Sequence, residues 1–403
     1  MMWEKVAIKD ICTGIYDGPH ATPPLSDTGA IFLGISNFNN GRLDFSDIRY
    51  ISEDDLPKWT KRVIPQKNDI VFSYEATLNL YAIIPEGFRG CLGRRMALLR
   101  VDETKADCKF LYYYFYSDAW RATVNENIVL GATVDRIPLI KFPDFPVELP
   151  PLETQHRIAD ILFAYDDLIE NNQKQIKLLE EAAQRLYKEW FVDLRFPGHE
   201  NTKIVDGVPE GWQYEKLGDL VKTTSGGTPS RRKSEYYVNG NIRWIKTKEL
   251  NDGFIFETEE HITEDAVKNS SAKVLPEGAL IVAMYGATIG KIGITAAEMA
   301  CNQACCAFIS FDDMISKEYL YCWLMDNREY LVSQGKGAAQ SNLSQEMIRN
   351  FSLLCPDKKV IKNFTEIVTT MLENKRVLEN KILMLSKARD DLLPKLMSGE
   401  VEV

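Results

Sequence analysis

The sequence predicts an α+β protein of two β-rich globular domains, each followed by a long helix, in which the two helices pair as an antiparallel coiled coil with pseudo-twofold symmetry. Three observations lead to this fold class. The chain repeats itself with a period of about 205 to 211 residues, each half contains short apolar runs separated by glycine and proline, and each half ends in a long segment whose apolar residues step by threes and fours.

Length and composition fit two folded domains. The 403 residues exceed what one ordinary core organises, and 45% hydrophobic with 26% charged residues excludes a largely disordered chain. No charged leader opens the sequence, and the longest apolar run, 279–289, is broken by Gly286 and is shorter than the roughly 20 residues that span a bilayer. We therefore expect a cytoplasmic protein without a membrane segment.

The two halves present the same landmarks in the same order. Each opens with a tryptophan and a strand-like segment, at 3–11 and at 212–220. Each then enters a turn rich in glycine and proline, at 17–23 and at 225–230, where these residues set tight backbone geometry. Buried-strand runs follow in matched pairs, at 31–36 and 242–247, 69–73 and 279–283, and 96–99 and 306–309. Each half therefore predicts one globular domain rich in short strands.

Each half closes with a helix-forming segment that begins just after proline, at Pro150-Pro151 and at Pro356, as suits a helix start. Its apolar or small positions repeat like a coiled-coil seam, with Lys375 and Arg389 as charged interruptions in the second copy. The residues expected to pair the helices are Ile158, Ile161, Tyr165, Leu168, Ile176, Leu179, Leu186, Phe364, Val368, Met371, Leu378, Ile382 and Leu385.

A seam of this length needs a long apolar partner, because a small domain cannot bury a rod of about 60 Å. Each helix is the obvious partner of the other, although both could instead dock on separate proteins. The predicted segments are a first domain, a first helix, a linker rich in glycine and proline, a second domain, and a second helix with the tail, at 1–150, 151–196, 197–211, 212–355 and 356–403.

The charge distribution matters more than the net charge of -10, which is unfavourable for a protein that neutralises phosphates. The stretch 222–248 carries seven basic residues against Glu235 alone, a net charge of +6. A basic footprint can therefore be local.

Candidate DNA contacts lie near the turns and strand ends, where lysine and arginine can hold phosphates and arginine can also read guanine. They are His20, Thr22, Arg94 and Arg95 in the first half and Thr228, Arg231, Arg232, Lys233, Lys246 and Lys248 in the second. Lys336 is added because its flanking glycines would let the backbone approach a phosphate. Exposed lysine and arginine also occur as ordinary solvated surface.

The sequence shows no catalytic equipment. The segment 286–291 resembles a phosphate loop, but it is one residue short between its glycines and has Ile292 where serine or threonine should bind magnesium. No methyltransferase tetrad of the form Asn/Asp-Pro-Pro-Tyr/Phe occurs, the four histidines lack metal-ligand spacing, and eight cysteines are too sparse for a disulfide framework. We expect no catalytic residue, metal or cofactor in this chain.

Four features together resemble the specificity subunit of Type I restriction-modification systems over essentially the full length. They are the order of domain, helix, domain and helix; the turns at 18–23 and 226–230; the segment 149–158; and the tail 392–401. The resemblance implies that each globular half is a target recognition domain for one part of a bipartite sequence in double-stranded DNA. It also implies that the helices fix the spacing between the parts.

The same resemblance implies the partners. Two methyltransferase subunits would dock on the helices and methylate adenine N6 with S-adenosylmethionine, and a motor-nuclease subunit would join for cleavage. The chain itself would not be an enzyme. The sequence leaves undecided which bases are read, how far apart the half-sites lie and whether a nuclease subunit is present.

Two other functions stay open from the residues alone. A coiled-coil adaptor with peptide-binding domains would not need the basic stretch beside a duplicated turn. A DNA-binding regulator would need a helix-turn-helix, for which no convincing pair of short helices is seen.

Overall fold

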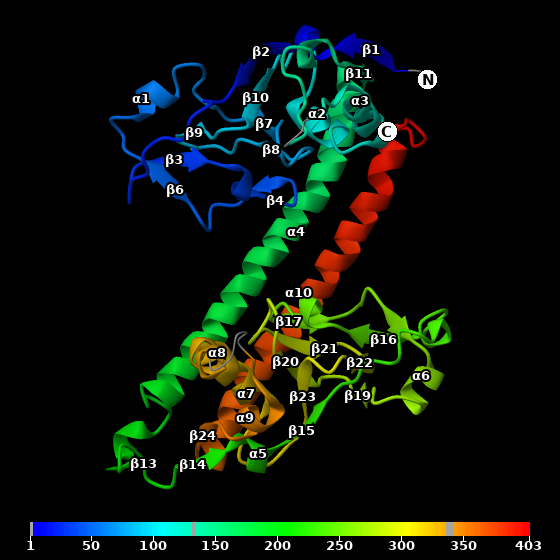
Figure 1. Ribbon diagram of the computed structural model, residues 1–403. Helices are drawn as coiled ribbons and strands as arrows, with labels where there is room; N and C mark the ends of the chain where they lie inside the picture. The colour runs from blue at the N-terminus through cyan, green and yellow to red at the C-terminus, as the bar shows by residue number, and fades with distance from the viewer. Residues whose placement is uncertain (1–2, 131–133, 336–341) are drawn as a thin grey trace. The chain divides into compact units, whose positions relative to one another are not determined.

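The computed structural model describes residues 3–130, 134–335 and 342–403 (Figure 1). The chain divides into two compact units, Met1–Leu168 with Leu385–Val403, and Ile169–Met384. Each unit holds one β-rich domain and a part of each long helix. The segments predicted from the sequence differ from these units, because they keep each long helix whole and separate from the domains. The bounds of those segments stay a prediction.

The first unit contains a four-stranded antiparallel sheet and a three-stranded mixed sheet. The first has the order β2 (Cys12–Asp17), β10 (Met96–Val101), β7 (Ile70–Ser73) and β8 (Tyr81–Ile83). The second has the order β6 (Arg49–Ile51), β3 (Ala30–Leu33) and β9 (Gly90–Leu92), with β3 and β9 parallel. The smaller elements are β1 (Glu4–Ala7), β11 (Pro146–Leu149), β4 (Phe38–Asn39), β5 (Arg42–Leu43), α1 (Leu56–Trp59), α2 (Cys108–Tyr114) and α3 (Asp118–Asn127), with 3-10 turns at Ile8–Ile11, Ile35–Asn37 and Phe142–Asp144.

Aromatic residues build the core of the first unit. Trp120 is fully buried on α3, its ring centroid lies 4.6 Å from that of Phe115, and its indole N–H donates to the hydroxyl of Tyr81 at 2.8 Å. Side chains cap the starts of α2 and α3: the Asp107 carboxylate accepts from the Phe110 amide at 2.7 Å, and the Ser117 hydroxyl accepts from the Trp120 amide at 3.3 Å. These aromatic residues therefore form part of the core of the first unit.

The second unit has a five-stranded sheet and a four-stranded sheet. The first has the order β15 (Val221–Ser225), β23 (Cys305–Phe311), β20 (Leu280–Ala283), β21 (Ile292–Thr295) and β17 (Gly253–Ile255). The second has the order β18 (His261–Ile262), β16 (Ile242–Ile245), β22 (Met299–Cys301) and β19 (Val274–Leu275). The smaller elements are β12 (Ile204–Val205), β13 (Val208–Pro209), β14 (Gln213–Lys216), β24 (Ser352–Cys355), α5 (Leu217–Leu220), α6 (Glu264–Lys268), α7 (Lys317–Asp326), α8 (Arg328–Gln334) and α9 (Gln345–Arg349), with 3-10 turns at His199–Asn201, Ser234–Tyr236 and Thr247–Glu249.

The internal repeat is visible in the strand order. The order β2-β10-β7-β8 recurs as β15-β23-β20-β21, and β6-β3-β9 recurs as β18-β16-β22. Strand directions recur as well, since β3 is parallel to β9 and β16 is parallel to β22. The antiparallel pair β1 and β11 recurs as β14 and β24. The second domain differs by adding β17 and β19. The predicted fold class of two similar β-rich domains with long helices is confirmed.

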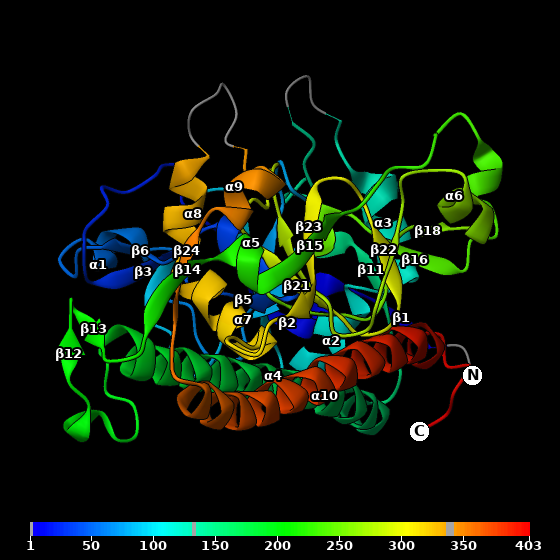
Figure 2. The same ribbon diagram turned by 90° about the horizontal axis from the view of Figure 1, so that it is seen from below.

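The two long helices are α4 (Leu152–Tyr187), which continues as a π-helical turn (Lys188–Val192), and α10 (Lys358–Met397). In the first unit, Ile158 and Leu162 of α4 share a hydrophobic cluster with Leu396 of α10, while Asp166 meets Arg389. In the second unit, Glu180 of α4 meets Lys375, and Trp190 lies 5.9 Å from Phe364 between ring centroids. Residue numbers thus run in opposite directions along the helices, which pack antiparallel within each unit (Figure 2).

The predicted pairing residues are mostly covered, with one correction. Ile158, Phe364 and Val368 are buried, whereas Leu168 is 50% exposed and does not lie on the pairing face. Its neighbour Ile169 is buried instead, as are Leu162 and Asp166. Steps that strictly alternate between three and four residues average 3.5, whereas a straight helix has 3.6 residues per turn, so the predicted positions rotate slowly off the buried face. The prediction therefore named Leu168 where Ile169 is buried. Within the described ranges, no helix combines the length and apolar character needed to cross a membrane.

Candidate nucleic-acid interface

The turn after β2 is held tightly against the turn between β9 and β10. The Gly18 amide donates to the Met96 carbonyl at 2.8 Å, and a Cβ at Gly18 would lie 2.6 Å from the Gly93 carbonyl oxygen. Only glycine allows this approach. The structure therefore brings the turn that carries His20 next to the turn that carries Arg94 and Arg95.

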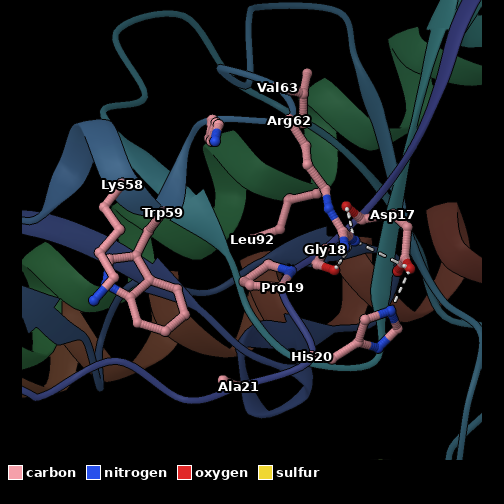
Figure 3. Close-up of a pocket in the computed structure, with 11 residues that line it drawn as sticks. Asp17, Gly18, Pro19, His20, Ala21, Lys58, Trp59, Arg62, Val63 and Leu92 are labelled. Carbon is pink, nitrogen blue, oxygen red and sulfur yellow. Dashed lines mark hydrogen bonds and ion pairs between the residues drawn. The ribbon is translucent and has the colours of Figure 1, made fainter.

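A hollow of about 360 Å³ opens beside this turn (Figure 3). Trp59 lies on one side of it, and Pro19 and Leu92 lie on the other. The Arg62 guanidinium donates to the Gly18 carbonyl at 2.9 Å and so ties the turn to the segment after α1. The remaining lining residues are Asp17, His20, Ala21, Lys58, Lys61 and Val63.

The predicted residues of the first half lie differently around this hollow. His20 lines it, is exposed and has its Nε2 2.9 Å from the Asp17 carboxylate. Thr22 and Arg94 are exposed but do not line it. Arg95 has a left-handed backbone (φ +72°), and its Nε lies 3.1 Å from the Glu75 carboxylate.

Sequence reasoning missed Lys58, Lys61 and Arg62. They are far from the turn along the chain, since Arg62 and Gly18 are 44 residues apart. The available signal was three basic residues within five positions around Trp59. Neither Lys58 nor Lys61 has a carboxylate partner among the described residues, so both can take a phosphate at the edge of the hollow.

The matching turn of the second unit is seated in the same way. The Gly227 amide donates to the Cys301 carbonyl at 2.9 Å, and a Cβ at Gly226 would lie 2.0 Å from that oxygen. The Trp244 indole donates to the Gly227 carbonyl at 3.0 Å, and the Thr228 hydroxyl donates to the Gln303 side chain. Thr228 thus lies where the turn meets the β22–β23 connection.

Three predicted basic residues form one cluster after this turn. The Arg231 guanidinium lies over the rings of Tyr237 and Trp244, at 4.3 and 5.2 Å from their centroids. Lys246 joins the same cluster because both it and Arg231 pair with Glu260, each at 2.6 Å.

Lys246 also lies 2.8 Å from the Glu259 carboxylate, which pairs with Lys248 as well. Hydrogen bonds from Lys246 and then Lys248 lower the pKa of Glu259 to about 2.

The other predicted residues of the second half are less organised. Arg232 is exposed and has no ion pair with any described residue. The Lys233 ammonium donates to the Tyr236 hydroxyl at 2.8 Å. Lys336 lies outside the described residues.

The charge of +6 counted along 222–248 is not the charge of the folded surface. Arg243 pairs with Glu257 at 2.9 Å, and Arg231, Lys246 and Lys248 pair with Glu259 and Glu260. These three glutamates lie just beyond the counted stretch. The interpretation that 222–248 forms a local basic footprint is therefore corrected, because four of its seven basic residues pair with these glutamates.

Within the described ranges, no group of three or more histidine, cysteine, aspartate or glutamate side chains is placed to hold a metal ion. The cysteines are free thiols, and burial raises the pKa of Cys306 to about 12.

The chain thus carries two copies of one β-rich domain, each with a glycine turn that has basic side chains beside it. The family described as "Type I restriction modification DNA specificity domain" matches residues 2–181 and 209–384. The chain therefore belongs to this family, whose specificity subunits are a non-catalytic component of type I restriction-modification systems.

Similar proteins agree with this assignment. The MjaIX specificity subunit of Methanocaldococcus jannaschii is 26% identical over 367 residues, covering 88% of this chain and 82% of the relative. The HindI specificity subunit of Haemophilus influenzae is 27% identical over 441 residues, covering 92% and 94%. The crystal structure of an S subunit from M. genitalium matches with a TM-score of 0.64 at 17% identity, covering 98% of this chain and 96% of that one, and it shares the fold. Of the three functions considered from the sequence, the specificity subunit is therefore favoured over the coiled-coil adaptor and the DNA-binding regulator.

Proposed function

We propose that the chain reads a bipartite sequence in double-stranded DNA, with the domain of each unit reading one part. The observation that carries this proposal is the repeated strand order, which presents an equivalent turn with nearby basic side chains in both units. Two similar readers in one chain suit two half-sites, and the paired helices would set the distance between them.

The catalytic partners belong to the same proposal. The chain would direct two methyltransferase subunits, which would use S-adenosylmethionine to methylate adenine N6. Motor-nuclease subunits would join where the system also cleaves. Because the target is cellular DNA, the complex would work in the cytoplasm. The net charge of -10 supports weak DNA affinity for the isolated chain.

The test is to map N6-methyladenine in host DNA by single-molecule sequencing, with and without this chain. The chain is first co-purified with the methyltransferase subunit that is encoded beside it. Methylation at one bipartite motif should disappear on deletion. Exchange of residues 1–150 for the same segment of a related subunit should change only one part of the motif, and exchange of 212–355 should change only the other. Unchanged methylation on deletion would overturn the proposal.

A further inference from the structure

Glu259 and Glu260 lie on the segment between β17 and β18 and contact three basic residues that are candidate DNA ligands of the second unit. Lys246 lies 2.8 Å from Glu259 and 2.6 Å from Glu260, Arg231 lies 2.6 Å from Glu260, and Lys248 pairs with Glu259. Arg231, Lys248 and Glu259 are more than half exposed, so this network is at the surface.

The backbone holds this segment in place independently of the ion pairs. The Glu249 carboxylate accepts from the amide of Lys246 at 2.7 Å and from the amide of Glu259 at 2.8 Å. The Trp244 amide donates to the Glu260 carbonyl at 3.0 Å and lies 3.1 Å from the Thr258 hydroxyl. The backbone that carries the two carboxylates is therefore fixed beside β16.

A carboxylate beside a lysine occupies the place that a phosphate oxygen would take. Exposed ion pairs contribute only about 0 to 1 kcal/mol, so a well-placed phosphate can still compete for the cation. The carboxylates nevertheless cancel the attraction of these cations for any DNA, and that attraction supplies nearly all of sequence-independent binding. The Glu259 carboxylate is ionised at neutral pH, and Lys246 and Lys248 lower its pKa further, to about 2.

In the part of the chain that the structure describes, two lysines of the first unit lack such carboxylates. Lys58 and Lys61 border its hollow, and neither has a carboxylate partner among the described residues. These two lysines therefore differ electrostatically from Lys246 and Lys248, whereas Arg62 at the same hollow pairs with Asp17.

We propose that Glu259 and Glu260 act as internal substitutes for DNA phosphates, which suppress sequence-independent binding by the second unit and make its affinity depend on base contacts. The inference rests on the proposed function, since it takes Arg231, Lys246 and Lys248 as DNA ligands. Lys58 and Lys61 of the first unit, which have no carboxylate partner among the described residues, would then contribute more of the general attraction for DNA than Arg231, Lys246 and Lys248 do.

The experiment compares the complete methyltransferase complex carrying the wild-type chain with one carrying Glu259→Gln together with Glu260→Gln. Fluorescence anisotropy measures binding to a duplex of about 30 base pairs that lacks the recognised motif, and to one that contains it, over a series of NaCl concentrations. The variant should bind the motif-free duplex more tightly. Its plot of log K against log salt should steepen by about 0.9 for each newly bound phosphate, and two such phosphates add a roughly tenfold fall between 50 and 200 mM salt. The ratio of the two affinities should decrease.

The matched control is Glu264→Gln with Glu298→Gln, which removes two charges from exposed positions of the same unit that do not contact Arg231, Lys246 or Lys248. An equal effect of both double variants, or no effect of either, overturns the proposal. Selective weakening on the motif duplex also overturns it, because the glutamates would then read bases themselves. A melting temperature within the range of the control confirms the fold. Failure of the proposed function can be distinguished from failure of this inference, because in that case the wild-type complex would methylate no bipartite motif.

Discussion

The ammonium of Lys375 on α10 lies 2.6 Å from the carboxylate of Glu180 on α4, and Lys375 is only 1% exposed. The same ammonium donates to the Tyr321 hydroxyl at 3.1 Å and to the Asp252 carbonyl. Burial alone would lower the pKa of Lys375, but Tyr321, Glu379 and Glu180 outweigh burial and raise it. One side chain thus joins two helices and the recognition domain of the second unit.

Lys375→Ala should strongly destabilise the second unit, because it leaves Glu180 and Glu379 near a buried site without their cation. Removing one partner of a buried ion pair typically costs about 3 to 5 kcal/mol. Hydrogen exchange at the amides of α7 and β17 should show faster opening. Lys381→Ala, at an exposed position of the same helix, is the control and should leave exchange unchanged. Equal protection in both variants would contradict the prediction.

The first unit contains a related contact whose coupling can be measured. Asp166 of α4 accepts from the Tyr113 hydroxyl at 2.6 Å and pairs with Arg389 of α10 at 2.5 Å. Asp166→Asn and Arg389→Gln should each destabilise this unit, and the double variant should lose less than the sum of the two. A coupling of about 0.5 to 3 kcal/mol is expected from a double-mutant cycle in urea. Additive losses would show that the two groups act independently.

The stability of the second unit should depend on pH through Asp252. Its carboxylate lies 2.7 Å from Lys291 and pairs with Arg328. Burial alone would raise the pKa of Asp252, but Lys291, the Ile292 amide and Arg328 outweigh burial and hold the pKa below its usual value. Because the folded pKa is lowered, the carboxylate stabilises the fold above its unfolded pKa of about 3.9, and this contribution is lost as the pH falls toward the folded value.

Asp252→Asn is the matched change, since asparagine also tolerates the left-handed backbone at this position (φ +64°). The variant should melt lower than the wild-type chain at pH 7, and the difference should shrink below about pH 4. Melting curves at pH 7, 5, 4 and 3 provide the measurement. A difference that is constant with pH would exclude Asp252 as the titrating group.

The turn after β2 should not tolerate a side chain at Gly18. A methyl group there would collide with the carbonyl oxygens of Gly93 and Met96, and overpacking of this kind costs about 1 to 3 kcal/mol. Gly87→Ala is the control, because its backbone is left-handed (φ +78°) but its surroundings are open. Both variants should lose stability, whereas only Gly18→Ala should reduce methylation at the motif. Normal methylation by the complex that carries Gly18→Ala would show that this turn does not contribute to DNA recognition.

Local periodicity explains which parts of this fold could be predicted from the sequence. Some elements depend mainly on residues that are neighbours in the sequence, so their patterns can be recognised from the sequence alone. Examples are the buried strand Ile70–Ser73 and the helix starts after Pro151 and Pro356. The seam at Leu168 was misplaced because three-and-four stepping does not follow the slow rotation of a real helix face.

The candidate interface was harder to predict because it depends on contacts between distant segments. Glu259 and Glu260 follow Lys246 by 13 and 14 residues, beyond the stretch in which charge was counted, and they neutralise it only after folding. Lys58 and Lys61 line the same hollow as the first turn, although they lie far from it along the chain. No linear pattern contains either relationship.

Lys58→Gln with Lys61→Gln should weaken DNA binding by the whole complex without changing which motif is recognised. Both lysines border the hollow beside Gly18, and phosphate contacts contribute equally to all sequences. The plot of log K against log salt should become less steep by about 0.9 for each lysine that binds a phosphate, to the same extent on motif-containing and motif-free duplexes.

Lys67→Gln with Lys105→Gln removes the same charge from exposed positions of the same unit that do not line the hollow, and it should leave the slope unchanged. A change in the methylated motif would mean that Lys58 or Lys61 reads a base. An unchanged slope would place the phosphates of the first half-site elsewhere. If only the lysine variants at the hollow flatten the salt dependence, Lys58 and Lys61 bind phosphates, as two cations without a carboxylate partner among the described residues should, whereas Lys246 and Lys248 already face Glu259 and Glu260.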